Sequence, residues 1–188
     1  MITFVTGRYN DETWAECYNY RISKKIPCVY GSPHEMSSKI YYNSLVFVIE
    51  MNNSRNRIEG IGLIKNKHLL DKCVRLHSDA NYNRYIYFGK FHVDRESLEN
   101  YNSDLVNILD DILFKGKTHS KRGAGLMAIP EKVLQLDRCV NVDIKKSIKD
   151  AFVCHFRHKF VPEMDNNTST ISNSTISNNT ISNNIRAI

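Results

Sequence analysis

Residues 45–64 read LVFVIEMNNSRNRIEGIGLI, and this stretch decides the fold class. The strand that opens it, which we extend back to cover residues 42–51, is β-branched and aromatic enough to be buried. Residues 52–56 have the composition of a turn, and residues 57–64 then return with the alternation of a second strand. The sequence therefore predicts a β-hairpin.

Two more strands are expected, one before this hairpin in the sequence and one after it. Residues 2–6 form a short β-branched run closed by Gly7, and residues 83–93 carry apolar rings on both faces, as in a barrel or between covering layers. Gly60 and Gly62 share one face of the second hairpin strand, where missing side chains allow another backbone or a flat ligand to come close. A bulge or a barrel bend is the other explanation for these glycines.

The second half of the chain has helical patterns. Ser103 is expected to cap a helix over 104–114 that Gly116 ends, and Pro130 is expected to open a short helix through Leu136. A third helix covers 144–156, with an inward face made of Ile144, Ile148, Ala151, Phe152 and His155. The predicted class is α+β, a small β-barrel or curved mixed sheet followed by C-terminal helices.

We expect one domain over residues 1–162 and a disordered Asn/Ser/Thr-rich tail over 163–188. From Thr170 the tail repeats with a period of five, which fits neither a strand nor a helix, and one Ile per repeat buries too little apolar area to order the chain. A β-aggregating segment or a short β-solenoid are the alternatives for this repeat.

The composition limits the environment of the protein. No run approaches the ~18 apolar residues of a membrane span, and the first residues are too short for a secretory core, so we expect no membrane partner and a cytoplasmic location. Five cysteines without a close pair argue against a disulfide framework. The richness in Asn, Ile, Lys and Tyr resembles translation of an AT-biased genome, of the kind seen in large cytoplasmic DNA viruses and some protists. A viral origin would imply that the protein is located in a host cell or in the virion.

The net charge is concentrated in one region. Residues 115–149 hold nine Lys or Arg against three acids, an excess equal to the +6 of the whole chain. Its densest part, residues 114–125, is called the basic segment below. Cations interleaved with glycines can surround a phosphate, so we predict nucleic-acid contacts, with RNA favoured over DNA; the candidate residues are Lys115, Lys117, Lys121, Arg122 and Gly123.

The glycine-bearing hairpin resembles the PUA-like superfamily of small β-barrels, in particular its EVE and ASCH-type members. In that superfamily a segment upstream of the hairpin helps to form a ligand cleft, and residues 22–34 hold that place here. The resemblance covers about residues 1–95 and implies a pseudobarrel that binds RNA or a modified nucleobase. It also implies Tyr30, Gly31 and Ser32 as cleft residues.

Other chemistry has weaker support in the sequence. The basic segment lacks the ordered P-loop pattern and follows a helix rather than a strand, which excludes an ATPase. Cys154, His155 and His158, with Cys139, could share a metal, but packing of Cys154 is the simpler explanation. Asp110 is expected to be a solvated helix residue. Catalytic groups could come from His34, His92 or His119 with Cys28, Glu50 or Glu59, although no spacing forces any two of these together.

The sequence thus predicts a nucleic-acid-binding module without catalysis, cofactor or metal. The alternatives are a nucleic-acid-processing enzyme and a virion or protein-interaction component whose basic face meets an acidic partner. A groove bordered both by residues 115–125 and by residues 28–34 would be the most informative structural finding.

Overall fold

The computed structural model describes residues 2–70, 74–117, 119–136, 139 and 142–157. Contacts group the chain into two compact units, Met1–Ile144 and Lys145–Ile188. The first unit holds the sheet with helices α1, α2 and α3, and helix α4 (Ile144–Phe156) supplies the described part of the second. The expected tail over 163–188, like the expected domain boundary at residue 162, lies outside the described residues.

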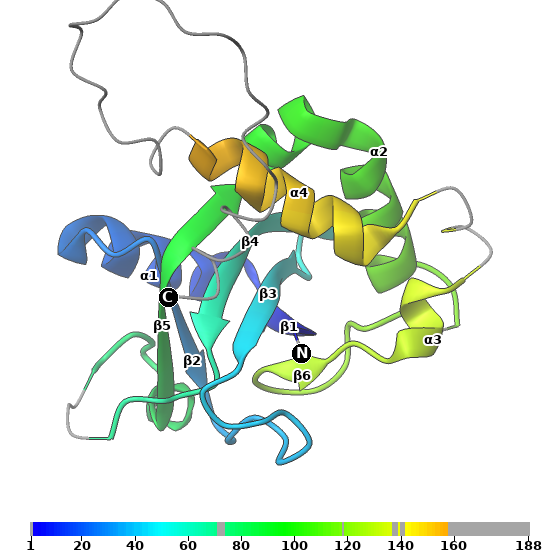
Figure 1. Ribbon diagram of the computed structural model, residues 1–188. Helices are drawn as coiled ribbons and strands as arrows, with labels where there is room; N and C mark the ends of the chain where they lie inside the picture. The colour runs from blue at the N-terminus through cyan, green and yellow to red at the C-terminus, as the bar shows by residue number, and fades with distance from the viewer. Residues whose placement is uncertain (1, 71–73, 118, 137–138, 140–141, 158–188) are drawn as a thin grey trace, which may run out of the picture. The chain divides into compact units, whose positions relative to one another are not determined.

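The chain has the predicted α+β class, because a mixed six-stranded sheet curls into a half-barrel and helices accompany it (Figure 1). The sheet has the order β2-β5-β4-β3-β1-β6. Strands β1 and β3 are parallel, and every other neighbouring pair is antiparallel. The strands are β1 (Thr3–Tyr9), β2 (Cys28–Ser32), β3 (Leu45–Asn52), β4 (Arg57–Lys65), β5 (Tyr85–Asp94) and β6 (Met127–Ala128).

The predicted hairpin is present as β3 and β4. Phe47 pairs with Leu63, and the register shifts after the Glu50–Gly60 pair, so that Glu59 is the extra residue of a bulge. The strand expected over residues 2–6 runs on to Tyr9, because Gly7 continues the parallel pairing with Glu50 instead of ending it.

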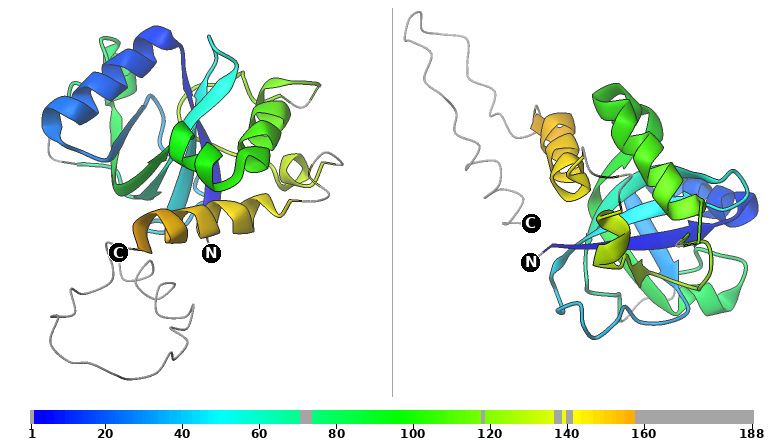
Figure 2. Two further views of the ribbon diagram at one scale, coloured as in Figure 1. Left: turned by 90° about the horizontal axis from the view of Figure 1, so that it is seen from above. Right: turned by 90° about the vertical axis from the view of Figure 1, so that its right-hand side faces the viewer.

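The two faces of the sheet are covered by different helices (Figure 2). Helix α2 (Arg95–Phe114) contacts β4 and β5, next to the face where Phe4 and Phe47 stack with centroids 5.2 Å apart. Helix α1 (Asp11–Lys24) contacts β1 and β2, and its buried Cys17 belongs to the core that includes Val46 and Val48. Successive residues of a strand point to opposite faces, so one strand supplies both cores.

Helix α1 is not among the helices expected from the sequence. It begins with a capping box in which Asn10 accepts from the Thr13 backbone N–H and Thr13 accepts from the Asn10 backbone N–H. Lys25 ends the helix in the left-handed conformation, with φ of 54°. Strand β2 then returns along β5 and forms one edge of the sheet.

Helix α2 starts nine residues earlier than expected, with Asp94 as its N-cap. The backbone at Asn102 is extended, with φ of −160°, and the Asn102 side chain accepts from the Leu105 N–H. Asn102 therefore caps the second part of α2, and the prediction that Ser103 does so was wrong by one residue. Gly116 ends this part as expected, with φ of 77°.

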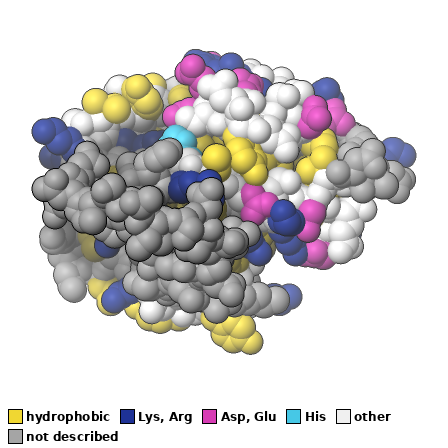
Figure 3. All heavy atoms as spheres, turned by 45° about the horizontal axis from the view of Figure 1, so that its top comes forward, with side chains coloured by type: hydrophobic (Ala, Val, Ile, Leu, Met, Phe, Trp, Pro, Cys, Tyr) yellow, Lys and Arg dark blue, Asp and Glu magenta, His cyan; other side chains and the backbone are white. Residues whose placement is uncertain are grey.

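The predicted later helices are also present. Helix α3 (Glu131–Leu134) follows Pro130, and α4 covers the predicted third helix. His155 is exposed and Phe156 is buried, so the inward face assigned to α4 was wrong at its end. No helix in the described part of the chain is long and apolar enough to cross a membrane. On the face drawn in Figure 3, acidic side chains are interspersed with Lys and Arg.

Candidate functional site

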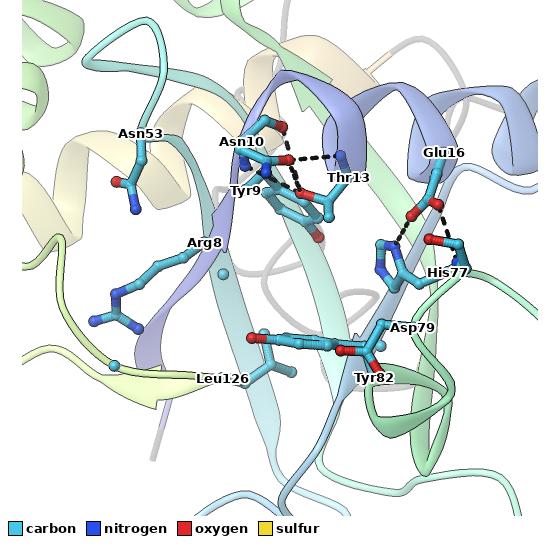
Figure 4. A pocket seen from close by; sticks show the side chains of 15 residues that line it. Arg8, Tyr9, Asn10, Thr13, Glu16, Asn53, His77, Asp79, Tyr82 and Leu126 are labelled. Atoms are coloured by element: carbon cyan, nitrogen blue, oxygen red, sulfur yellow. Dashed lines mark hydrogen bonds and ion pairs between the residues drawn. The ribbon is translucent and has the colours of Figure 1, made fainter.

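The first unit contains a pocket of about 330 Å³ beside the end of β1 (Figure 4). It is called the seam pocket below, because it lies where the two ends of the curled sheet approach each other. Its lining residues come from five separate stretches of the chain and include Arg8, Tyr9, Glu16, Gly31, Asn53, His77, Asp79, Tyr82, Gly123, Gly125 and Leu126.

Strands β2 and β6 are the edges of the sheet, at opposite ends of the strand order. Curling brings β2 close to the segment that precedes β6, because a Cβ on Gly125 would overlap the Ser32 hydroxyl. A Cβ on Gly31 would likewise overlap the Tyr82 carbonyl. Glycine at position 125 therefore lets the two ends of the sheet approach, glycine at position 31 lets the short 3-10 helix η1 (Ala80–Asn83) lie against β2, and the remaining space is the seam pocket.

Two polar side chains hold the basic segment against the pocket. Arg8 on β1 donates from Nε to the Ser120 carbonyl at 2.5 Å, and Asn53 at the hairpin turn donates from Nδ2 to the Lys121 carbonyl at 3.2 Å. Among the described residues, the buried Arg8 Nη1 and Asn53 Oδ1 have no hydrogen-bond partner. Burial lowers the pKa of Arg8, since desolvation disfavours its charge.

Aromatic rings form the middle of the pocket. Tyr9 packs edge-on against Trp14 with centroids 5.4 Å apart, and its ring lies 6.5 Å from that of His77. Tyr82 meets His77 edge-on at 6.0 Å. Burial raises the pKa of Tyr9 well above its ordinary value, so its hydroxyl stays protonated at neutral pH. These rings offer apolar surface with hydroxyl and imidazole groups at its edges.

The opposite end of the pocket from Arg8 is acidic (Figure 4). Glu16 accepts from His77 Nδ1 at 2.8 Å and from the Ser78 backbone N–H at 3.0 Å. Burial opposes the charge of Glu16, but the bonds from Ser78 and His77 outweigh it and lower the pKa. Asp79 lies at the same end and accepts from the Asn81 N–H.

A buried polar cluster lies on the α1 side of the sheet. Glu50 is fully buried and accepts from Tyr30 Oη at 2.8 Å, from Arg21 Nη1 at 3.4 Å and pairs with His92 Nε2 at 2.9 Å. Burial opposes its charge, but His92, Arg21 and Tyr30 outweigh that cost and lower the pKa of Glu50.

The two glycines of β4 make room for this cluster. A Cβ on Gly62 would overlap the Tyr30 hydroxyl, and one on Gly60 would lie 2.9 Å from His92 Nε2 and 3.0 Å from Glu50 Oε2. A Cβ on Gly60 would also lie 2.9 Å from the Val93 backbone carbonyl, so the close approach of another backbone that was expected at this face is present, together with buried side chains. The bulge was the alternative, and it is also present, at Glu59.

The residues predicted to contact nucleic acid are spread along the basic segment. Lys115 pairs with Asp111 at 2.9 Å and, like Lys117, is exposed. Lys121 is half-buried beside the exposed Arg122, and Gly123, which follows them, lines the seam pocket. Only the end of the basic segment therefore borders the pocket.

The three predicted cleft residues have different surroundings. Tyr30 is fully buried with its hydroxyl on Glu50, and Ser32 is buried with its hydroxyl donating to the His34 carbonyl. Gly31, between them, lines the seam pocket together with Gly123. The predicted cleft segment and the basic segment thus border the same pocket, the arrangement that was expected to be most informative.

Several other candidates are now placed. Burial raises the pKa of the Cys28 thiol to about 12, so it is not a nucleophile at neutral pH. Cys154 is exposed, and His158 lies outside the described residues. In the part of the chain that is described, no group of three or more His, Cys, Asp or Glu could hold a metal ion.

Asp110 is not the solvated residue that was expected. It accepts from the Ile58 N–H at 2.7 Å and from Arg95 Nη1 at 2.9 Å, which ties α2 to the start of β4. Burial raises its pKa despite these bonds. The prediction failed because the partner on β4 is 52 residues away in sequence.

Sequence reasoning missed most of the pocket, namely Arg8, Tyr9, Glu16, Asn53, His77 and Tyr82. No spacing connects them, since they meet only through pairing of distant strands. Comparison with protein-family models, curated proteins and solved structures gives no match to this chain, so its function has to be inferred from the pocket itself.

Proposed function

We propose that this protein binds single-stranded RNA without catalysis, with one unpaired nucleotide in the seam pocket and the neighbouring phosphates on the basic segment. The observation that carries this proposal is that Gly31 and Gly123, from the two segments singled out in the sequence, line one pocket. The curled sheet is compatible with the PUA-like barrels that the hairpin resembles, and membership of that superfamily is part of the proposal.

The charges near the pocket suit a phosphate backbone. Lys121 and Arg122 directly precede Gly123 on the rim, and Lys117 is exposed nearby in sequence. Cations that neutralise phosphates release counterions, which supplies most sequence-independent affinity for nucleic acids. Within the described residues, none of these three cations forms an ion pair, so they are available to phosphates.

The pocket itself suits one nucleotide better than a duplex. Bases of a single strand can be splayed out and stacked on aromatic rings, whereas paired bases cannot reach a recess. Tyr9, His77 and Tyr82 supply such rings, and about 330 Å³ is within the usual volume of a small-molecule site. These features favour single-stranded RNA over duplex DNA.

One observation favours a nucleic-acid-processing enzyme as the second candidate. His77 is buried in the pocket wall, and Glu16 holds its Nδ1, the way a carboxylate orients a general base. Incubation of labelled RNA with the protein would decide between the two. Products that disappear in His77→Asn would favour the enzyme, and intact RNA that remains bound favours the module.

A salt titration tests the binding proposal. Lys117→Gln, Lys121→Gln and Arg122→Gln together remove three phosphate contacts, which should flatten the slope of log affinity against log salt by about two units on single-stranded RNA. The matched control carries Lys24→Gln, Lys39→Gln and Lys90→Gln, three exposed cations that do not line the pocket. It should keep the parent slope.

Two results would overturn this proposal. One is undetectable binding of RNA by the parent protein at low salt. The other is an equal change of slope in the test and control variants. Either result would indicate that the basic segment contacts an acidic protein partner, such as a virion component, instead of RNA.

A further inference from the structure

The seam pocket carries opposite charges at its two ends (Figure 4). At one end a Cβ on Gly123 would lie 3.8 Å from Arg8 Cζ, so the basic segment accompanies the guanidinium of Arg8. At the other end Glu16 and Asp79 supply two carboxylates. Among the described residues, no Lys or Arg forms an ion pair with either carboxylate. The negative charge at this end is therefore open to a ligand.

The groups at the acidic end are held in place by the fold. Glu16 on α1 accepts from His77 Nδ1 and from the Ser78 N–H, so its carboxylate lies against residues 77–78. The Asn83 side chain accepts from the His77 N–H at 2.8 Å and donates to the His77 carbonyl at 2.7 Å. Asp79 follows directly in the chain, and its Oδ1 accepts from the Asn81 N–H. The acidic end is thus preorganised.

The two carboxylates and the imidazole at this end all accept hydrogen bonds. An ionised carboxylate can only accept. Because Glu16 accepts from His77 Nδ1, that nitrogen carries the proton, and Nε2 of the neutral ring is an acceptor. His77 is only 4% exposed, and its Nε2 has no hydrogen-bond partner among the described residues. Whereas Arg8 Nη1 is completely enclosed, His77 Nε2 is not, so it faces the pocket that His77 lines.

A ligand group at the acidic end should donate hydrogen bonds and carry no negative charge. A nucleotide inside an RNA strand has a phosphate on each side of its ribose, so one phosphate would meet Glu16 and Asp79. Like charges in such contact oppose binding. The nucleotide at the 3′ end has a phosphate only on its 5′ side, and on the other side it has two adjacent hydroxyls that can donate.

We propose that the seam pocket binds the 3′-terminal nucleotide of RNA, a proposal that rests on the proposed function. The 2′- and 3′-hydroxyls donate to His77 Nε2 and to the Asp79 carboxylate. The 5′-phosphate then points to the other end of the pocket, toward the basic segment. The 5′ end of a strand matches this arrangement less well, since it offers either a phosphate or a single hydroxyl.

The test compares three uridine octamers of RNA, each labelled at its 5′ end, by fluorescence anisotropy on the full chain. One ends in an unmodified ribose, one in a 3′-phosphate and one in a terminal 2′-deoxyribose. We expect the second and third to bind roughly 10- to 150-fold more weakly, the range for one hydrogen bond to a charged group. A surface that only attracts phosphates would bind the 3′-phosphate form at least as tightly as the first, because that form carries more negative charge.

A double variant assigns the preference to the acidic end. Glu16→Gln with Asp79→Asn removes both charges but keeps the size of the side chains, and Asn is as good a capping residue as Asp. This variant should bind the unmodified and 3′-phosphate octamers equally tightly. The matched control, Glu96→Gln with Asp104→Asn, removes two exposed acids of α2 that do not line the pocket. It should keep the preference of the parent.

The outcomes separate this inference from the proposed function. Equal binding of the unmodified and 3′-phosphate octamers by the parent would overturn recognition of the 3′ end and leave RNA binding intact. An unchanged preference in the double variant would overturn the role of the acidic end. If none of the octamers binds, the proposed function fails, and this inference fails with it.

Discussion

Gly62→Ala is expected to destabilise the protein strongly, although it adds a single methyl group. The new Cβ would overlap the Tyr30 hydroxyl and lie 3.1 Å from Cys28 Sγ, both fully buried. Overpacking of a core costs about 1–3 kcal/mol. Displacing Tyr30 also weakens its bond to the Glu50 carboxylate, and a hydrogen bond to a charged group is worth about 1.5–3 kcal/mol. The unfolding free energy should therefore fall by about 3–5 kcal/mol.

Gly7→Ala is the matched control for this change. Its Cβ would lie 3.3 Å from Val48 and 3.4 Å from Leu126, both side chains that can adjust, so the cost should stay below about 1 kcal/mol. Urea unfolding followed by the fluorescence of Trp14, the single tryptophan, measures both variants. Equal losses in the two variants would refute the argument that Tyr30 occupies the space of a side chain at residue 62.

Three further predictions concern stability. Phe47→Ala removes a buried ring stacked on Phe4 and should lower the free energy of urea unfolding by about 3–5 kcal/mol. The control Arg55→Ala should change it by no more than about 0.5 kcal/mol. Similar losses in the two variants would mean that the buried face of the hairpin was misassigned. The pKa of Glu50 lies below its ordinary value of 4.5, so its contribution to folding stability is present above pH 4.5 and is lost as the pH falls through the folded-state pKa. The difference in unfolding free energy between the parent and Glu50→Gln should therefore narrow below pH 4.5. A difference that stays constant with pH would contradict the buried ion pair. Removal of residues 163–188 should change the unfolding free energy by less than about 0.5 kcal/mol, because the repeat offers no apolar face; a larger drop in thermal stability would show that the tail packs.

The hairpin and the later helices could be predicted because their signals are local. Alternation and turn composition lie within residues 45–64, and the helices have apolar stripes with Gly or Pro at their ends. Helix α1 was hard to recognise, since Cys17 is its only fully buried residue and a capping box of Asn10 and Thr13 is a weak signal. The cap at Asn102 was missed because Ser103 beside it is an equally good capping residue.

The pocket could be predicted only in part, because its walls are joined by long-range pairing. The sequence singled out Gly31 through the resemblance of the hairpin to PUA-like barrels, and Gly123 through the charge excess of its segment. Arg8, Asn53 and His77 have no such local pattern. Their role follows from the position of β1 beside the edge strand β6 and from the curl that brings β2 toward this end of the sheet. Tyr30 shows the converse, a candidate near the pocket whose side chain lies in the core.

The curl of the sheet determines which backbone amides a nucleotide bound in the seam pocket would protect from exchange. Strands in the middle of the sheet are held on both sides by ladders, but β2 pairs only with β5, and β6 pairs only with β1. A nucleotide in the seam pocket would contact both ends of the curled sheet at once and stabilise each of them against the other. Amide hydrogen exchange should therefore slow together at Gly31 and around Gly125, which are more than ninety residues apart in sequence, while the already protected centre of β3 changes little.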